Sequence, residues 1–332
     1  MPAPSPSSQR RGRPLRFGAG LVVLLAVAGY LVVQYVTAGT GAPGCRVVSS
    51  SGNASYEFTP EQAVNAATIS AVGTDRGMPE RAVTIALATA LQESGLRNLA
   101  HGDRDSLGLF QQRPSQGWGT ARQVTDPAYA ANVFYAHLAK VPDYTGLPLT
   151  VAAQRVQRSG FPEAYAKHEP DATLLAAALT GRSAASLTCA GRPGTTTATG
   201  PDAVRAALVR DFGRAVIQQA GAEVDPAGDA SAAPSARAEA PRAHGGGRTV
   251  TLPVTADAGG DGRSVRERGW QLAHWAVANA SALHIERVSY AGREWVAGNT
   301  DSRWRTTGGN EASGTGGARG SGADSVRIVT GE

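Results

Sequence analysis

The sequence predicts a mainly α domain after one N-terminal transmembrane helix, followed by a small C-terminal α+β domain. Three observations support this fold class. A long apolar run begins at Phe17, helical periodicity dominates residues 54–190, and alternation typical of a strand first appears near Thr249. A chain of 332 residues also has room for two folded units, because single cores rarely grow beyond about 250 residues.

The N-terminal segment has the pattern of a membrane anchor. Residues 1–16 form a basic tail, and the apolar segment 17–38 is long enough to span a hydrocarbon core of roughly 30 Å. The basic flank predicts a single-pass cell-membrane protein with a cytoplasmic N-terminus and the bulk of the chain outside. Val36, Thr37 and Ala38 also resemble a signal-peptide cleavage site, which would make the protein secreted.

Residues 39–53 are small and polar, and we expect them to form a spacer before the α domain at 54–190. The domain begins with an N-cap pattern, because Thr59 and Pro60 precede Gln62 and a run of apolar residues at helical spacing. Further helices are expected from Pro79 to Gly95, after Asp126, and at 149–157, 162–167 and 172–179.

The two cysteines of the chain, Cys45 and Cys189, bracket the α domain. Outside the cytoplasm such a pair can oxidise and persist, so we expect a disulfide that ties the entry of the domain to its exit. The alternative is two unrelated buried thiols.

The remainder of the chain predicts a second, smaller domain. Residues 191–200 are rich in Gly, Thr and Pro and are interpreted as a linker to an α+β domain at 201–332. Within that domain, residues 226–247 lose all periodicity, which predicts a disordered insert. Helices are expected at 201–220 and 264–283, and strands at 249–254, in a hairpin at 285–296, and at 325–329. We expect Trp270, Trp275, Trp295 and Trp304 to form a small core rather than an exposed binding face.

Charge and composition limit the classes of partner. A net charge of +5 gives only weak attraction to anionic polymers such as cell-wall glycans or lipid headgroups. Outside the N-terminus there is no dense run of arginines, so nucleic-acid binding is not expected. No ligand cluster at metal-binding spacing occurs in the sequence, and neither a metal nor a cofactor is expected. Protein partners are left open.

Residues 91–114, LQESGLRNLAHGDRDSLGLFQQRP, carry the pattern of an active site. A helix ends in Glu93-Ser94-Gly95, and a polar loop leads to a Ser-x-Gly-Leu-x-Gln step. This pattern resembles the active-site signature of the lysozyme-like superfamily, specifically of soluble lytic transglycosylases and goose-type lysozymes. The resemblance covers about residues 57–180. The C-terminal part is similar to a module that recurs beside lytic domains in exported proteins of high-GC Gram-positive bacteria.

The resemblance implies that Glu93 protonates the leaving glycosidic oxygen. It also implies that Ser106, Gly108, Leu109 and Gln111 line the floor of a glycan cleft, with Gln111 contacting the substrate or orienting the glutamate. Independently, the negative end of the helix dipole and partial burial both disfavour the Glu93 carboxylate and should raise its pKa. A carboxylic acid that is protonated near neutral pH suits glycosidic cleavage. The alternative is an exposed glutamate at a helix end that is followed by a glycine cap.

Other candidates surround this glutamate in the sequence. Asp103 and Asp105 are candidates for a second carboxylate, which would position water and favour hydrolysis as in goose-type lysozymes. Without one, the substrate's own hydroxyl attacks and gives a 1,6-anhydro sugar; the alternative is that both acids only hold the loop. Trp118 has a flat face for sugar stacking or for core packing. Tyr165 stands near the position where the family has an aromatic, and is a candidate for substrate binding.

The sequence therefore predicts an enzyme that cleaves peptidoglycan glycan strands at the cell envelope. It would be a lytic transglycosylase or a muramidase-like glycoside hydrolase, with Glu93 as acid and then base. Val156 and Gln157 stand where the family often has a Tyr-Asn pair. That departure is consistent with the alternative, a catalytically inactive wall-binding or scaffolding protein with the same fold.

Overall fold

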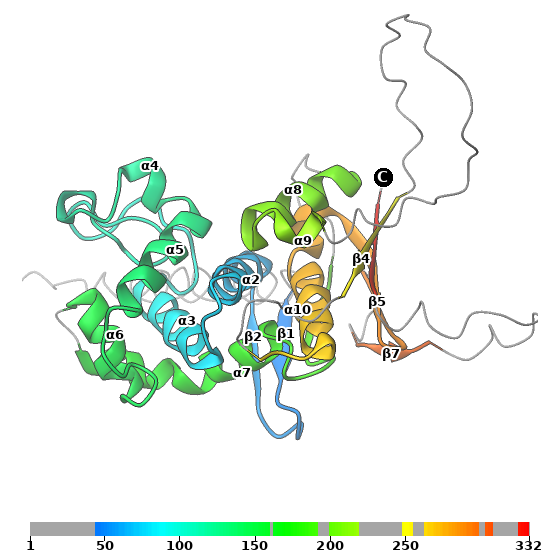
Figure 1. Ribbon diagram of the computed structural model, residues 1–332, viewed down its shortest axis with the longest axis horizontal. Helices are drawn as coiled ribbons and strands as arrows, with labels where there is room; N and C mark the ends of the chain where they lie inside the picture. Colours follow the sequence, from blue (N-terminus) through cyan, green and yellow to red (C-terminus); the bar gives the residue numbers. More distant parts are fainter. Residues whose placement is uncertain are drawn as a thin grey trace, which may run out of the picture. The chain divides into compact units, whose positions relative to one another are not determined.

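The structure, a computed structural model, describes residues 44–159, 162–191, 199–218, 248–254, 262–298, 303–307 and 325–331. The described residues form one compact unit (Figure 1). The predicted basic tail at 1–16, anchor at 17–38 and insert at 226–247 lie outside the described residues. In the part of the chain that is described, no helix is long and apolar enough to cross a membrane.

Helices make up about half of the described residues. They are α2 (Pro60–Asp75), α3 (Glu80–Ser94), η1 (Pro114–Gln116), α4 (Ala121–Val124), α5 (Pro127–Leu138), α6 (Leu149–Gln157), η2 (Pro162–His168), α7 (Glu169–Leu179), α8 (Gly200–Phe212), α9 (Ala215–Gln218), α10 (Val265–Ala278) and α11 (Ala280–Leu283). The strands are β1 (Cys45–Val48), β2 (Ser55–Phe58), β3 (Leu187–Cys189), β4 (Thr249–Pro253), β5 (Ile285–Tyr290), β6 (Arg293–Val296), β7 (Arg305–Thr306) and β8 (Ser325–Thr330).

The start of α2 confirms the N-cap pattern read from the sequence. The Thr59 hydroxyl accepts a hydrogen bond from the backbone N–H of Gln62, and the Gln62 side chain accepts one from the backbone N–H of Thr59. Pro60 occupies the first turn, where its missing N–H costs no helical hydrogen bond. These local contacts fix where the helix begins.

The predicted fold class is wrong. It described a mainly α domain after a transmembrane helix, with sheet only in a small C-terminal domain. Instead, two small sheets are present among the described residues, and the first is an antiparallel sheet in the order β2-β1-β3 formed by strands between Cys45 and Cys189. Strand β1 lies inside the predicted spacer at 39–53, and β3 follows the last helix of the predicted α domain. Strands of three or four residues are too short for their alternation to stand out from a loop.

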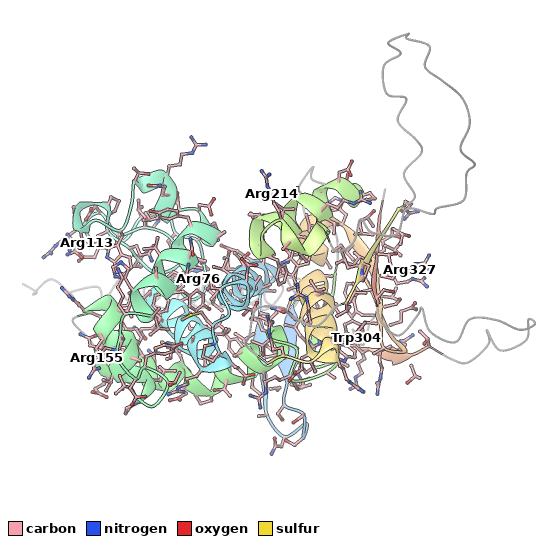
Figure 2. All side chains as sticks on the ribbon, in the orientation of Figure 1. Arg76, Arg113, Arg155, Arg214, Trp304 and Arg327 are labelled. Atoms are coloured by element: carbon pink, nitrogen blue, oxygen red, sulfur yellow. A yellow bond between two sulfur atoms is a disulfide. The ribbon has the colours of Figure 1, made fainter. Side chains whose placement is uncertain are left out.

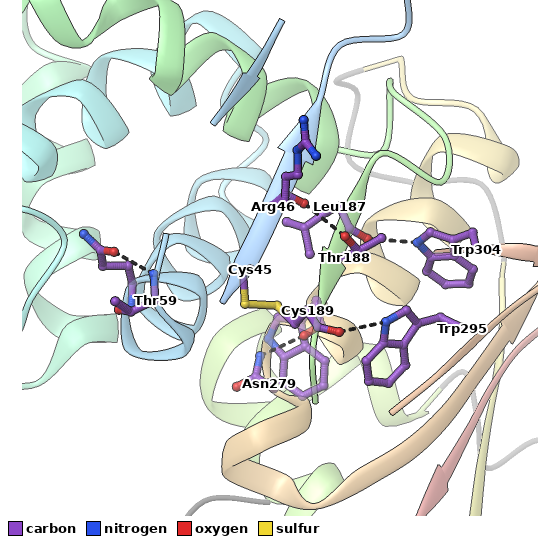
Figure 3. Close-up of a disulfide and its surroundings, with 11 residues drawn as sticks. Cys45, Arg46, Thr59, Leu187, Thr188, Cys189, Asn279, Trp295 and Trp304 are labelled. Carbon is purple, nitrogen blue, oxygen red and sulfur yellow. Dashed lines mark hydrogen bonds between the residues drawn. A yellow bond between two sulfur atoms is a disulfide. The ribbon is translucent and has the colours of Figure 1, made fainter. Parts of the chain in front are cut away.

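The disulfide predicted between Cys45 and Cys189 is confirmed (Figure 3). These two residues pair directly across β1 and β3, and both are buried. The bond spans a sequence separation of 144 residues, which corresponds to roughly 5 kcal/mol of stabilisation if it acts through loop entropy in the unfolded state. It therefore fixes the short β3 strand against the entry of the folded region.

The second sheet packs one face on α10. Its strand order is β4-β8-β5-β6-β7, with every neighbouring pair antiparallel. The expectation that the tryptophans form a core is confirmed, since Trp270, Trp275, Trp295 and Trp304 are all buried. Trp295 Nε1 donates to the carbonyl of Cys189 at 3.1 Å, and Trp304 Nε1 donates to the carbonyl of Leu187 at 2.9 Å (Figure 3). The second sheet is thereby joined to β3 of the first.

Helix α10 also packs against α2, α7 and β3, so both halves of the chain share one core. Its residue His274 is fully buried, with Nδ1 2.7 Å from the carbonyl oxygen of Ala178 and Nε2 3.3 Å from the backbone nitrogen of Ser186. A carbonyl only accepts and an amide N–H only donates, so the proton lies on Nδ1 and the ring is neutral. Burial agrees with this, because it lowers the pKa of His274 to about 4.

A buried carboxylate forms a second connection between the two halves. Asp211, near the end of α8, is 1% exposed. It accepts hydrogen bonds from the Thr68 hydroxyl of α2 at 3.2 Å, from Trp275 Nε1 of α10 at 2.8 Å, and from Arg210 Nε at 2.8 Å. The negative charge is therefore compensated by three donors, two of which come from helices that are far apart in the sequence.

We expect Asp211→Asn to destabilise the protein by about 3 kcal/mol, because the amide presents an N–H group to donors that need an acceptor and leaves Arg210 uncompensated. Urea unfolding followed by tryptophan fluorescence measures this. The matched control is Asp202→Asn on the same helix, whose side chain is 99% exposed and pairs with Arg205. We expect that variant to change stability by less than about 0.5 kcal/mol. Equal effects of the two variants would contradict the role of Asp211.

Candidate active site

Glu93 lies half-buried at the C-terminal end of α3. The helix ends at Gly95, which has a φ of 63° in the left-handed region where glycine carries no steric penalty. The backbone N–H of Leu96 then donates to the carbonyl of Ala90 at 3.1 Å, and closes the helix in a Schellman-like arrangement. The position of Glu93 is thus set by the last turn of a helix whose body is buried.

The chain after Glu93 is held from two directions. Two amide side chains of α2 donate to its carbonyls: Gln62 Nε2 to Gly95 and Asn65 Nδ2 to Leu96, both at 2.8 Å. The hydroxyl of the buried Ser94 donates to the carbonyl of Leu109 at 2.7 Å. The helix end that carries the glutamate is therefore joined both to α2 and to the Ser-x-Gly-Leu-x-Gln loop.

Two side chains from the region after α5 contact the Glu93 carboxyl group. The buried Tyr165 of η2 donates its hydroxyl to Glu93 Oε1 at 2.7 Å. The side chain of Gln157, the last residue of α6, lies near the Glu93 carboxyl group and favours its ionised form, while its Nε2 donates to the carbonyl of Phe110 at 2.8 Å. The hydroxyl of Ser159 in turn hydrogen-bonds Tyr165. Glu93 is therefore held in one orientation by side chains whose own positions are fixed by further hydrogen bonds.

Burial raises the pKa of Glu93 above its usual range, and the hydrogen bonds from Tyr165 and Gln157 oppose that rise. Burial and the adjacent Glu93 carboxyl both raise the pKa of Tyr165, so the phenol stays protonated and remains a donor. A glutamate in this environment keeps its proton to a higher pH than an exposed one does. When Glu93 releases that proton, the carboxylate that remains is stabilised by the side chains of Tyr165 and Gln157.

The Ser-x-Gly-Leu-x-Gln loop lies beside this helix end. Ser106 and Leu109 are buried, and Gly108 has a φ of 75°. A Cβ at position 108 would lie 2.1 Å from the carbonyl oxygen of Val124, so only glycine fits there. The Gln111 side chain donates from Nε2 to the carbonyl of Gly108 at 3.2 Å, within its own loop.

The amide that contacts Glu93 is therefore that of Gln157, which the sequence analysis did not place in the site. One signal for it existed in the sequence. Gln157 stands where the resembled family has the asparagine of its Tyr-Asn pair, and both residues end in a carboxamide that donates through N–H. The replacement keeps the type of hydrogen-bonding group while lengthening the side chain.

The two loop aspartates have other roles. Asp105 accepts hydrogen bonds from Arg113 Nε at 2.9 Å and from the backbone N–H of Ser115 at 2.8 Å, which hold its pKa well below the usual range. The Asp103 side chain is 91% exposed and lies 4.0 Å from Arg104. The contacts of Asp105 match the alternative that the acids hold the loop, whereas the Asp103 side chain faces solvent.

The aromatic residues of this region divide between core and surface. Phe110 is buried and stacks on Phe134, with ring centroids 4.7 Å apart. Trp118 is the one of the five tryptophans that is only partly buried, and its ring stacks on His137 with centroids 4.4 Å apart. Trp118 therefore retains accessible ring surface. Among the described residues, no group of three or more His, Cys, Asp or Glu side chains is placed to hold a metal ion.

Comparison with known protein families finds similarity in the C-terminal part of the chain. The family model described as "VldE, C-terminal domain" matches residues 206–316, about a third of the sequence. The matched range begins inside α8 and includes α10 and the β5–β6 hairpin, and it does not include Glu93. No curated protein matches the chain.

We expect Glu93→Gln to stabilise the protein at about pH 7 by roughly 0.5–2 kcal/mol, the range of single stabilising substitutions. The pKa of Glu93 is higher in the folded state than in the unfolded state. The native protein therefore loses stability as pH rises from the pKa of Glu93 in the unfolded chain through its pKa in the folded protein. The neutral amide avoids that loss. Urea unfolding should therefore show a gain at about pH 7 and none at about pH 3.5, where both states are protonated.

The control for this substitution is Asp103→Asn, which removes an exposed carboxylate and should leave stability unchanged at both pH values. A Glu93→Gln variant that is less stable than the native protein at about pH 7 would show that the carboxylate is not disfavoured by burial.

Proposed function

We propose that this protein cleaves the glycan strands of peptidoglycan outside the cytoplasm, with Glu93 as general acid and then general base. The observation that carries the proposal is the environment of Glu93. It is a half-buried carboxyl group with a raised pKa, and the buried Tyr165 hydroxyl holds it at 2.7 Å. Breaking a glycosidic bond needs a proton donor of this kind. The resemblance of residues 91–114 to the lytic transglycosylase signature supports the same assignment.

The proposed reaction has two steps. First, Glu93 gives its proton to the glycosidic oxygen as the bond from C1 of N-acetylmuramic acid to that oxygen breaks. Next, the C6 hydroxyl of the same sugar attacks C1 and returns its proton to the Glu93 carboxylate. The product is a 1,6-anhydro sugar, the enzyme is restored, and no water is consumed. Attack by water in place of the C6 hydroxyl would give a reducing end instead.

The contacts of the two loop aspartates favour the anhydro product. Hydrolysis generally uses a second carboxylate to activate water. Asp105 is paired with Arg113 and with the Ser115 backbone, and Asp103 is turned to solvent. Asp105 is therefore engaged within its own loop and the Asp103 carboxylate faces solvent. We therefore propose the substrate's own hydroxyl as the nucleophile.

Tyr165 and Gln157 act as positioning residues in this proposal. They hold the carboxyl group in one orientation, which places its proton reproducibly at the scissile oxygen. After proton transfer, the same two donors stabilise the carboxylate that forms. Trp118 is the proposed sugar-stacking residue, because its ring stacks on His137 and retains accessible surface.

The rival function is a scaffolding protein that binds the wall without turnover. It would be favoured if Trp118 or Phe110 filled the space at the glutamate. Their ring partners are instead His137 and Phe134. The buried Cys45–Cys189 disulfide supports an oxidising, extracytoplasmic location, in which the wall is accessible to either function.

We expect the full-length protein to release soluble fragments with 1,6-anhydro ends from purified peptidoglycan sacculi, as detected by mass spectrometry. Glu93→Gln should release roughly 10²- to 10⁴-fold less, because it has no dissociable proton. Asp103→Asn is the control and should release native amounts. Binding to sacculi without any release by the native protein would support the scaffold, and reducing ends would replace the anhydro route with hydrolysis.

Tyr165→Phe tests the positioning role. Loss of the hydroxyl removes a donor that lowers the pKa of Glu93, so that pKa should rise further and the alkaline limb of the rate profile should move to higher pH. The position of this alkaline limb is measured from the rate at which sacculi lose turbidity across a pH series. The matched control is Tyr135→Phe, another buried tyrosine, whose hydroxyl donates to the carbonyl of Ile69. A limb that moves equally in both variants, or in neither, would contradict the role of Tyr165.

A further inference from the structure

A series of contacts leads from Glu93 to the last turn of α5. Gln157, at the end of α6, lies near the Glu93 carboxyl group and donates to the carbonyl of Phe110 at 2.8 Å. The Phe110 ring stacks on Phe134 of α5, with ring centroids 4.7 Å apart. His137 follows Phe134 by three residues, so it lies beside Phe134 on the surface of the helix, one turn nearer its end. The last turn of α5 therefore adjoins the candidate active site.

This turn carries an accessible aromatic ring with two cations beside it. The Trp118 ring stacks on the exposed His137, with ring centroids 4.4 Å apart, and is itself only partly buried. Lys140 follows His137 by three residues, and Arg158 is the residue after Gln157. Partial burial lowers the pKa of the His137 imidazole, and the positive charges of Lys140 and Arg158 lower it further. Both cations are therefore close to the ring on which Trp118 stacks.

The charges of these two cations are available to a ligand. Lys140 and Arg158 are exposed, and neither side chain forms an ion pair or a hydrogen bond with any residue that the structure describes. Arg158 closes α6 through its backbone N–H, which donates to the carbonyl of Gln154 at 2.8 Å, so its guanidinium group is not needed for that cap. Like charges held close together repel each other, and a bound anion would offset that repulsion. The surface around Trp118 thus favours a ligand with both a flat apolar face and a negative charge.

We propose that this surface is a subsite for the muramoyl unit of the glycan strand, whose ring stacks on Trp118 while Lys140 and Arg158 bind a carboxylate of its 3-O substituent. This inference rests on the proposed function and adds to it what the strand carries at one subsite. Ammonium and guanidinium groups form charge-assisted hydrogen bonds with carboxylates, and an aromatic ring packs on the apolar face of a sugar. The lactyl group supplies the carboxylate in a peptide-free strand, and the peptide supplies it in a peptide-bearing one.

Such a subsite would fix the register of the strand at Glu93. The glucosamine unit of the strand has no acidic substituent, so the two cations distinguish it from the muramoyl unit. Because the two sugars alternate, a muramoyl unit held at Trp118 determines which of the two kinds of glycosidic bond lies at the Glu93 carboxyl group. Lys140 and Arg158 are thereby assigned as specificity-determining residues that do not contact the reacting atoms.

The test is calorimetric titration of the full-length Glu93→Gln protein, which does not cleave the strand during the measurement. The ligand is a peptide-free hexasaccharide of peptidoglycan with free lactyl carboxylates, compared with its methyl ester, which keeps the shape and removes the charge. We expect the acid to bind roughly three- to tenfold more tightly at low ionic strength, because two exposed cations pair with it. Adding Lys140→Gln and Arg158→Gln should abolish that preference and leave binding of the ester unchanged.

The matched control removes two exposed arginines in the C-terminal half of the chain, Arg214→Gln and Arg327→Gln, with the same change in net charge. Figure 2 shows both side chains pointing outward from the fold. This variant should keep the preference for the acid within about twofold. A loss as large as that of the Lys140 and Arg158 variant would reduce the preference to net charge and overturn the proposal.

The same comparison with a peptide-bearing strand and its methyl ester identifies the source of the carboxylate. The proposal is overturned if neither acid binds more tightly than its own ester. Trp118→Ala should weaken acid and ester alike, roughly three- to tenfold, because stacking does not depend on the charge. A loss confined to the acid would contradict the stacked arrangement.

Two further measurements keep the test decisive. Circular dichroism verifies the fold of the double variant, and the single variant Lys140→Gln, which should halve the preference or reduce it further, replaces the double variant if that one is unfolded. Release of fragments from sacculi by the native protein separates the two proposals. Release without a preference for the acid would overturn the subsite alone, and a preference for the acid without release would overturn the cleavage alone.

Discussion

Burial of α2 on all of its sides is the constraint on which the rest of the structure depends. Every residue from Asn65 to Thr74 is buried, so the helix has no face for solvent and needs packing partners all around it. Helices α3 and α5 pack against it, and so do α8 and α10 from the C-terminal half of the chain (Figure 1). Its many alanines and Gly73 allow this close approach. A Cβ at Gly73 would lie 2.6 Å from the Tyr135 hydroxyl.

This arrangement connects the candidate active site with the C-terminal half of the chain. Through Gln62 and Asn65, α2 holds the backbone that follows Glu93, and through Thr68 it contacts the buried Asp211. Asp211 in turn accepts from Trp275 of α10. The region matched by the VldE C-terminal family therefore supplies part of the packing that keeps α2, and with it the end of α3, in place.

Sequence reasoning succeeded where the determining interaction is local or covalent. The N-cap at Thr59 and the glycine that ends the Glu93 helix depend on contacts within a few residues, and the disulfide depended on there being only two cysteines to pair. The first sheet was missed because its strands have three or four residues each, and β3 pairs with β1 across most of the α-helical region. Gln157 was missed as a contact of Glu93 because the two are 64 positions apart, at the ends of different helices.

The sequence by itself determined the start of α2, the end of α3, the disulfide pair and the glutamate that stands at a helix terminus, because each follows from residue type and short-range geometry. Only the tertiary structure decided which donors face that glutamate, and that the two halves of the chain share one core. It also decided that Asp105 is held by Arg113 and the Ser115 backbone, whereas the Asp103 side chain faces solvent. The physical reason is that burial and hydrogen-bond partners arise between segments distant in sequence, and a pKa or a shared core follows from those contacts and not from the residues alone.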